Sequence, residues 1–246
     1  MFERTAYSWL QKYAPTGGLL LSLSNTPFFL TKDELGFDAS VDKHSKEILE
    51  KSFWNLGPIF SRTEILKKLG FTTTIISDFL VDDGDRIVNS NLPLEWTASD
   101  LVDKFDVVLD MGVSEASYNI GQVFKNVLTA CRPGGIIIHS QVMNGVNYGF
   151  WAVSPSAPID FYTENNCTIL EMGTLSGNTY PLTYIPLLTD TSSLAKIVKP
   201  LAPLTYSCVL LYVVQKGHQT KHSKWPIFNG HAQLLRTKIK FVEVDK

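Results

Sequence analysis

Residues 105–140, FDVVLDMGVSEASYNIGQVFKNVLTACRPGGIIIHS, decide the fold. Phe105–Leu109 is an apolar run without polar alternation, which is typical of a strand covered on both faces. Tyr118–Cys131 carries its apolar residues at helical spacing, and Pro133-Gly134-Gly135 is expected to end that helix. Ile136–Ser140 is again an apolar, strand-like run. A strand, a helix and a second strand in this order predict a parallel βαβ unit.

The pattern continues on both sides of this unit. Gly18–Ser24 and the β-branched Thr72–Ser77 are predicted strands, and Thr168–Met172 and Tyr206–Val214 are two more. A helix is predicted over Ser61–Leu69, where the first residue and the glutamate three positions later can form a capping box. We therefore expect an α/β fold, a doubly wound, mostly parallel sheet with helices on both faces.

Three segments are expected along the chain. Residues 1–16 form an N-terminal amphipathic helix, in which polar residues interrupt the apolar ones, so no secretory signal is expected there. Residues 17–216 form the α/β domain, within which the proline-containing stretch Asn178–Pro203 is predicted to be an extended connection or lid. Residues 217–246 form a basic C-terminal extension, either a solvated tail or an added edge element.

Composition limits the possible functions. With 246 residues, of which 44% are hydrophobic and 19% charged, the chain can bury a core without disulfides or metals. A net charge of −2 argues against nucleic acid as the main partner, and no apolar run is long enough to span a membrane. The three cysteines, Cys131, Cys167 and Cys208, are far apart and odd in number, so a reducing, cytoplasmic location is expected.

Polar residues follow the predicted strands where ligands collect in a parallel sheet. Asp78 ends the second strand, where a carboxylate can accept hydrogen bonds from a ribose diol; an N-cap or turn role is the alternative. Asp110 is followed by Gly112, which combines a strand-end carboxylate with a glycine that lets a ligand approach the backbone. An ordinary strand-to-helix turn is the alternative for this pair.

Extended to Asn166, the deciding stretch resembles the second half of a class I S-adenosylmethionine-dependent methyltransferase. Small bacterial-type members of that family carry a D-x-G-x-x-E-H-x-x-N segment and a later HGF-x-x-x-SP segment. The matching residues here are Asp110, Gly112, Glu115, Ala116 and Asn119, then Tyr148-Gly149-Phe150 and Ser154-Pro155. The resemblance covers roughly residues 17–172. It implies a Rossmann-like methyltransferase fold with S-adenosylmethionine as cofactor.

The resemblance also implies a role for each site residue. The cofactor would lie across the loop after the first strand, with its ribose on Asp78 and its adenine near the Asn89–Asn91 turn. The implied cofactor-binding residues are Ser22, Ser24, Asn25, Asp78, Asn89, Asn91, Asp110, Gly112 and Val113. Asn144 and Tyr148 would line the pocket of a small-molecule acceptor, with an ordinary polar loop as the alternative. No metal site is expected.

Glu115 is the candidate catalytic residue. It would act as a general base or orient an acceptor hydroxyl or amine; the alternative is an acidic first-turn residue favoured by the helix dipole. The absence of G-x-S-x-G, G-x-G-x-x-G and Walker A motifs counts against a hydrolase with a nucleophile elbow, a nicotinamide or flavin dehydrogenase and a P-loop enzyme.

The chain departs from the family pattern at four positions. The glycine-rich first loop is degenerate, with Ser24 at a glycine position, and Asn89 replaces an aspartate. Ala116 and Tyr148 stand where these relatives often carry histidine. Two functions follow: a methyltransferase that acts on a small-molecule or glycan-precursor acceptor, or a catalytically inactive methyltransferase-like binding or scaffold protein. The sequence favours the enzyme.

Overall fold

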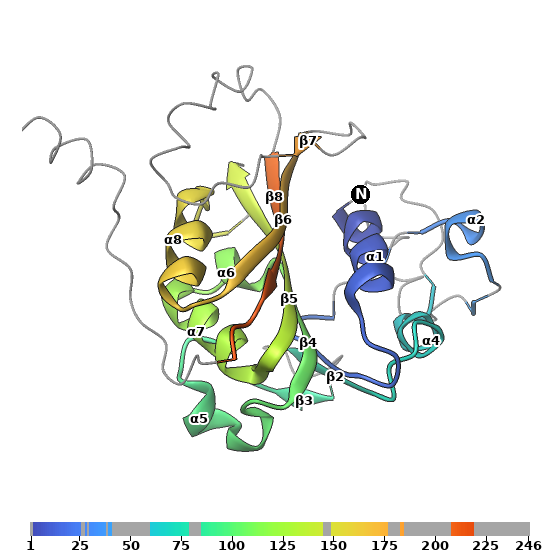
Figure 1. The fold of residues 1–246 in the computed structure, drawn as a ribbon, viewed down its shortest axis with the longest axis horizontal. Helices are drawn as coiled ribbons and strands as arrows, with labels where there is room; N and C mark the ends of the chain where they lie inside the picture. The colour runs from blue at the N-terminus through green and yellow to red at the C-terminus, as the bar shows by residue number, and fades with distance from the viewer. Residues whose placement is uncertain are drawn as a thin grey trace, which may run out of the picture.

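An eight-stranded sheet forms the centre of the computed structural model (Figure 1). The structure describes residues 2–25, 28, 30–37, 39–40, 60–78, 85–144, 149–176, 183–184 and 208–218, with the backbone alone at 2–4, 78, 175–176 and 183–184. The strands are β1 (Leu19–Ser22), β2 (Thr73–Asp78), β3 (Arg86–Ile87), β4 (Phe105–Met111), β5 (Cys131–Asn144), β6 (Thr168–Ser176), β7 (Thr183–Tyr184) and β8 (Cys208–Gln215). The helices are α1 (Phe2–Tyr13), α2 (Lys32–Leu35), α4 (Arg62–Lys68), α5 (Leu94–Thr97), the 3₁₀ turn η1 (Ser99–Leu101), α6 (Val113–Ala116), α7 (Ile120–Ala130) and α8 (Ser156–Glu164).

The strand order β3-β2-β1-β4-β5-β8-β6-β7 confirms the predicted doubly wound sheet. The first five strands in this order are parallel, whereas β8 runs antiparallel to both β5 and β6, and β7 runs antiparallel to β6. The chain passes from β1 outward to β2 and β3, then returns to β4 on the other side of β1. Because this reversal opens a crevice at the carboxyl ends of the strands, it fixes where a ligand site is expected.

Helices cover both faces of the sheet, as the sequence predicted (Figure 1). The helices α1, α2 and α4 pack on one face, and α5, α7 and α8 pack on the other. Successive side chains along each strand point to opposite faces and contribute to the core on both of them. Leu20 and Val107 face the first set of helices, and their neighbours Leu21 and Val108 face the second. The strands are buried on both sides, which explains why their sequences are continuous apolar runs.

The N-terminal helix packs directly against this sheet. Its contacts are with β5 and β8, and three side chains of α1 converge on Glu171 of β6. Trp9 donates from Nε1 to the carboxylate over 2.8 Å, and Lys12 and the Tyr13 hydroxyl donate to its other oxygen. No helix among the described residues is both long and apolar enough to cross a membrane. Of the basic extension, only residues 217–218 are described.

Two local predictions need correction. Ser61 does cap α4 by accepting a bond from the Glu64 amide at 3.4 Å, but the Glu64 carboxylate does not reach back. It accepts bonds from the backbone and hydroxyl of Ser40 instead, at 2.8 and 2.5 Å, so half of the capping box is replaced by a contact with a distant loop. Helix α7 ends at Ala130, and Pro133-Gly134-Gly135 lies inside β5, as a bulge where the register against β4 shifts.

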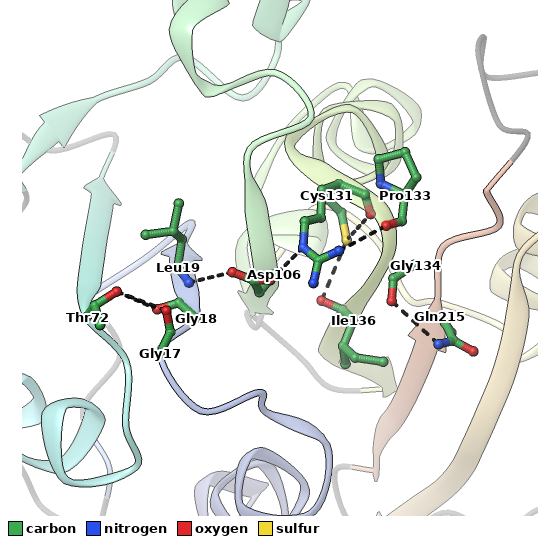
Figure 2. A network of polar contacts seen from close by, with 11 residues as sticks. Gly17, Gly18, Leu19, Thr72, Asp106, Cys131, Pro133, Gly134, Ile136 and Gln215 are labelled. Atoms are coloured by element: carbon green, nitrogen blue, oxygen red, sulfur yellow. Dashed lines mark hydrogen bonds and ion pairs between the residues drawn. The ribbon is translucent and has the colours of Figure 1, made fainter.

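That bulge belongs to a polar network along the amino-terminal edge of the parallel strands (Figure 2). Asp106 of β4 accepts the backbone N–H of Leu19 at 2.7 Å and the Nε–H of Arg132 at 2.5 Å. Gly135 has no room for a side chain, because a Cβ there would lie 2.7 Å from the Cys131 sulfur. The network holds the edge of the sheet that lies opposite the predicted ligand crevice.

Candidate functional site

The carboxyl ends of β1 and β4 meet where the strand order reverses. The Leu23 amide donates to the Leu109 carbonyl at 2.9 Å, and the Ser24 hydroxyl lies 3.4 Å from the Met111 carbonyl. The structure thus brings together the two loops that the sequence assigned to the cofactor, Ser22–Asn25 and Asp110–Val113. The Ser24 side chain thus connects the two strand ends.

The loop after β1 is braced by a buried cation, Arg62 of α4. Its guanidinium donates to the Ser24 carbonyl at 2.7 Å and to the Ser22 hydroxyl, which itself donates to the Ser24 carbonyl at 2.8 Å. Burial lowers the pKa of Arg62 to about 10, so the group is still charged at neutral pH. Sequence analysis missed Arg62. The available signal was its place in the first turn of a helix, where the dipole disfavours a positive charge.

Gly112 forms the turn after β4 in a conformation that glycine favours. Its φ is +92°, and its amide donates to the Ser140 carbonyl at 3.0 Å. Among the described residues, a Cβ at this position would meet only the Glu115 carboxyl, at 3.5 Å, which leaves this side of the backbone open to a close approach. This is the strand, turn and glycine arrangement that the sequence predicted, with Val113 beginning α6 directly after it.

Asp110 is completely buried and is bonded within the protein. One oxygen accepts the amides of Val113 and Ser114 at 3.0 and 3.2 Å, and the other accepts the Ser114 hydroxyl and His139 Nδ1. Burial opposes ionisation, but the bonds from His139 and Ser114 outweigh it and lower the pKa of Asp110. The carboxylate therefore holds the turn and the start of α6, and its direct contact with a cofactor stays a prediction.

Sequence analysis also missed the buried network behind Asp110. His139 of β5 bonds Asp110 through Nδ1 at 2.8 Å and the Tyr162 hydroxyl through Nε2 at 2.5 Å. Its ring stacks on Tyr212, with centroids 4.6 Å apart, and the Tyr212 hydroxyl donates to Gln141 at 2.7 Å. A histidine within an otherwise apolar strand indicates a buried polar partner, but the sequence does not name it.

Glu115, the predicted catalytic residue, lies beside this turn as a buried carboxyl. One oxygen accepts the Val142 amide at 3.3 Å, and the other, Oε2, has no hydrogen-bond partner in the part of the chain that the structure describes. Burial first, and then the nearby charge of Asp110, raise the pKa of Glu115 to about 8. A carboxyl with one unused oxygen and a raised pKa can accept a proton from a ligand that reaches it.

The predicted adenine side is a turn held by amide side chains. Asn89 accepts the Asn91 amide at 3.0 Å, and Asn91 in turn accepts the amide of Asn119 at 2.8 Å. Buried Asn126 of α7 bonds the Leu94 amide and two carbonyls of the same loop. The turn therefore has a defined shape, and contacts of Asn89 and Asn91 with a cofactor remain predictions.

The structure describes the remaining predicted site residues, Asp78, Asn144 and Tyr148, to different extents. Asp78 ends β2, next to β1 on the same edge of the sheet, and only its backbone is described. Asn144 ends β5, where its side chain accepts the Cys208 amide. Tyr148 lies outside the described residues. An acceptor-binding role for Asn144 and Tyr148 stays a prediction.

No protein-family model and no curated protein sequence matches the chain. Solved structures with a similar arrangement include an S-adenosylmethionine-dependent methyltransferase from Mesorhizobium loti, at 12% identity over 87% of this chain and 100% of that chain, with a TM-score of 0.46. A candidate methyltransferase from Bacillus halodurans is 10% identical over 86% and 98% of the two chains, with a TM-score of 0.46. The [4+2]-cyclase SpnF is 9% identical over 87% and 80%, with a TM-score of 0.42. Likeness at this level does not decide a function, so the function has to be argued from the site.

Proposed function

We propose that this chain is an S-adenosylmethionine-dependent methyltransferase that acts on a small-molecule acceptor, with Glu115 as the proton-accepting residue. The observation that carries the proposal is the buried Oε2 of Glu115, which no described residue bonds and which lies next to the Gly112 turn, at the reversal of strand order. The resemblance of residues 105–166 to such enzymes supports the same assignment.

The residues of the crevice fit the cofactor at two points. Arg62 places a buried positive charge beside the loop after β1, which is complementary to the carboxylate of an amino-acid moiety. Gly112 leaves the backbone after β4 open to a ligand. Ser24 fits less well, because it carries a side chain at a position where the family pattern has glycine, and its hydroxyl lies 3.4 Å from the Met111 carbonyl.

When bound, S-adenosylmethionine supplies an electrophilic methyl group, so the protein has to align the acceptor and remove a proton. Glu115 is suited to the second task, because its raised pKa makes it a stronger base than an ordinary carboxylate. A positive charge nearby favours the ionised form of a carboxyl, so binding of a cationic ligand in the crevice would convert Glu115 to its proton-accepting state.

Calorimetric titration with S-adenosylhomocysteine tests the cofactor assignment. We expect the wild-type protein to bind it and the Asp78→Ala variant to bind at least about tenfold more weakly, as loss of a charge-assisted hydrogen bond implies. Glu95→Ala, which removes an exposed carboxylate on α5, is the matched control and should leave binding unchanged. Absence of binding by the wild-type protein would refute the proposal.

A turnover assay separates the enzyme from its inactive alternative. A panel of amine and hydroxyl acceptors is incubated with radiolabelled S-adenosylmethionine, and transfer is compared between the wild-type protein and Glu115→Gln. We expect transfer to fall by about 100-fold or more in the variant while S-adenosylhomocysteine still binds. Binding without transfer to any acceptor would favour the methyltransferase-like binding protein.

A further inference from the structure

Three aromatic side chains gather on the surface beside Glu115, and we refer to them as the aromatic cluster. They are Tyr118, Phe150 and Trp151, with 75%, 67% and 43% of their surfaces exposed. The Tyr118 ring meets Phe150 edge to face, at 5.9 Å between centroids and 81° between planes, and it meets Trp151 at 6.5 Å and 57°. Exposed aromatic rings that contact one another mark a candidate binding surface.

Backbone hydrogen bonds fix the aromatic cluster in place. The Trp151 indole N–H is shared between the carbonyls of Ser117 and Tyr118, at 3.1 Å each. The Phe150 amide donates to the Glu115 carbonyl at 2.7 Å. The rings are therefore positioned by the same segment that carries Glu115.

Gly149 allows this segment to lie directly against Glu115. A Cβ at Gly149 would come within 2.6 Å of the Glu115 carbonyl oxygen and 3.1 Å of its Cγ, and the φ of +153° also disfavours a side chain. Only glycine permits this approach. The segment that carries Phe150 and Trp151 consequently packs against the main chain and the Cγ of Glu115, which brings the aromatic cluster next to this residue.

The electrostatics of this site favour a cation. Glu115 lies close enough to the buried Asp110 to feel its negative charge, and its Oε2 lacks a hydrogen-bond donor among the described residues. The faces of aromatic rings are negative as well, and aromatic walls beside a carboxylate attract ammonium groups. A neutral planar ligand could stack on the rings, but it would bring no positive charge to the carboxyl.

We infer that the acceptor carries an amine, bound as an ammonium ion by the aromatic cluster and the Glu115 carboxylate. The inference rests on the proposed function for its chemistry. The ammonium gives one N–H proton to Oε2 of Glu115, which frees the nitrogen lone pair. That pair forms the new N–C bond to the methyl group, while the electron pair of the broken C–S bond stays on sulfur. The products are an N-methylated ammonium and a neutral thioether.

Choline and its uncharged analogue 3,3-dimethylbutan-1-ol test the cation site without any methyl transfer. The two have the same shape, and neither needs the cofactor to bind, so ligand-detected NMR titration measures the site alone. We expect choline to bind at least about tenfold more tightly than the analogue, which corresponds to about 1.4 kcal/mol. Equal binding of the two ligands, or binding of neither, would overturn the inference.

Variants locate the site and separate its failure from that of the proposed function. Tyr118→Leu and Trp151→Leu should each weaken choline binding by about fivefold to tenfold, and Glu115→Gln should reduce the preference over the neutral analogue. Trp96→Leu is the control, because Trp96 is 79% exposed on α5 outside the cluster, and it should have no effect. Choline binding that the cluster variants leave unchanged contradicts the inference. Choline binding without S-adenosylhomocysteine binding refutes only the proposed function. S-adenosylhomocysteine binding without choline binding refutes only the amine inference.

Discussion

The Nδ1 atom of His139 lies 2.8 Å from Oδ2 of Asp110, and both side chains are completely buried. Because Asp110 also holds the amides of Val113 and Ser114, this contact braces the start of α6 from within the core. Glu115 follows one residue later. The position of the candidate base thus depends on a histidine of the neighbouring strand that does not face the ligand crevice directly.

Replacing His139 by leucine should destabilise the fold strongly. The substitution removes the ring hydrogen bond of the buried Asp110 carboxylate, and a buried charged group that loses a hydrogen-bond partner typically costs about 3 kcal/mol or more. Urea unfolding at pH 7 measures the loss. Tyr162→Phe is the control, since it removes the second His139 bond and keeps the aromatic packing, and it should cost about 1 kcal/mol. An equal loss of unfolding free energy in the two variants would show that the contact with Asp110 stabilises the fold no more than the contact with Tyr162.

The strands were predictable because most of them are continuous apolar runs in the sequence. Phe105–Leu109 and Thr72–Ser77 are each found as strands, extended by two residues in β4 and shifted by one residue in β2. The Gly112 turn was predictable for a related reason, since a glycine after a strand-end carboxylate is a local signal. Boundaries were less accurate where tertiary contacts decide, as at the Pro133-Gly134-Gly135 bulge, whose position depends on pairing with β4.

The partners of the site residues could not be predicted from the sequence. Asp110 was expected to face a ligand, yet four hydrogen bonds within the protein surround its carboxylate. Arg62 and His139 lie 48 and 29 residues from it in sequence, and only the folded sheet brings them to the same edge. The local sequence pattern identifies residues whose side chains could take part in chemistry. Burial and the hydrogen-bond donors that the fold places around them decide which of these side chains are left to contact a ligand.

The Glu115→Gln variant should be more stable than the wild-type protein at pH 8 and nearly equal to it at pH 5. The pKa of Glu115 is raised from 4.5 to about 8, so between these values the folded protein holds a proton that the unfolded chain has lost. Stability contributed by this group is present below the unfolded pKa and falls as pH rises toward 8. Removing the charge should raise the free energy of unfolding by about 2–5 kcal/mol at pH 8. The size of the pKa shift sets the upper end of this range.

Urea unfolding at several pH values measures this difference, with Glu95→Gln as the control for an exposed glutamate. The control should track the wild-type protein across the whole range. A Glu115→Gln variant that is less stable than the wild-type protein at pH 8 would mean that the carboxylate is solvated or paired in solution.

The Ser24→Gly variant should bind S-adenosylhomocysteine more tightly. The Ser24 hydroxyl lies 3.4 Å from the Met111 carbonyl, and a glycine without a side chain would let a ligand approach the backbone here more closely. We expect a gain of about tenfold in affinity by calorimetry, with a loss of stability of up to about 1 kcal/mol from the greater freedom of glycine. Ser99→Gly, on the distant turn η1, is the matched control. Weaker binding by Ser24→Gly would indicate that the hydroxyl contacts the ligand.

Lys216 bonds the carboxyl end of α7, which lies between β4 and β5. Its replacement by methionine should destabilise the fold by about 2–4 kcal/mol. The buried Nζ donates to the carbonyls of Leu128 and Cys131 at 2.8 and 2.7 Å and to Asp103 at 2.6 Å. These bonds satisfy backbone groups at the end of α7 and place a positive charge where the helix dipole favours one. Methionine fills the same space but leaves the carbonyls without a donor. Lys104→Met changes an exposed lysine nearby and should alter the free energy of unfolding by less than about 0.5 kcal/mol. Similar unfolding curves for the two variants would show that the end of α7 is satisfied by water rather than by Lys216.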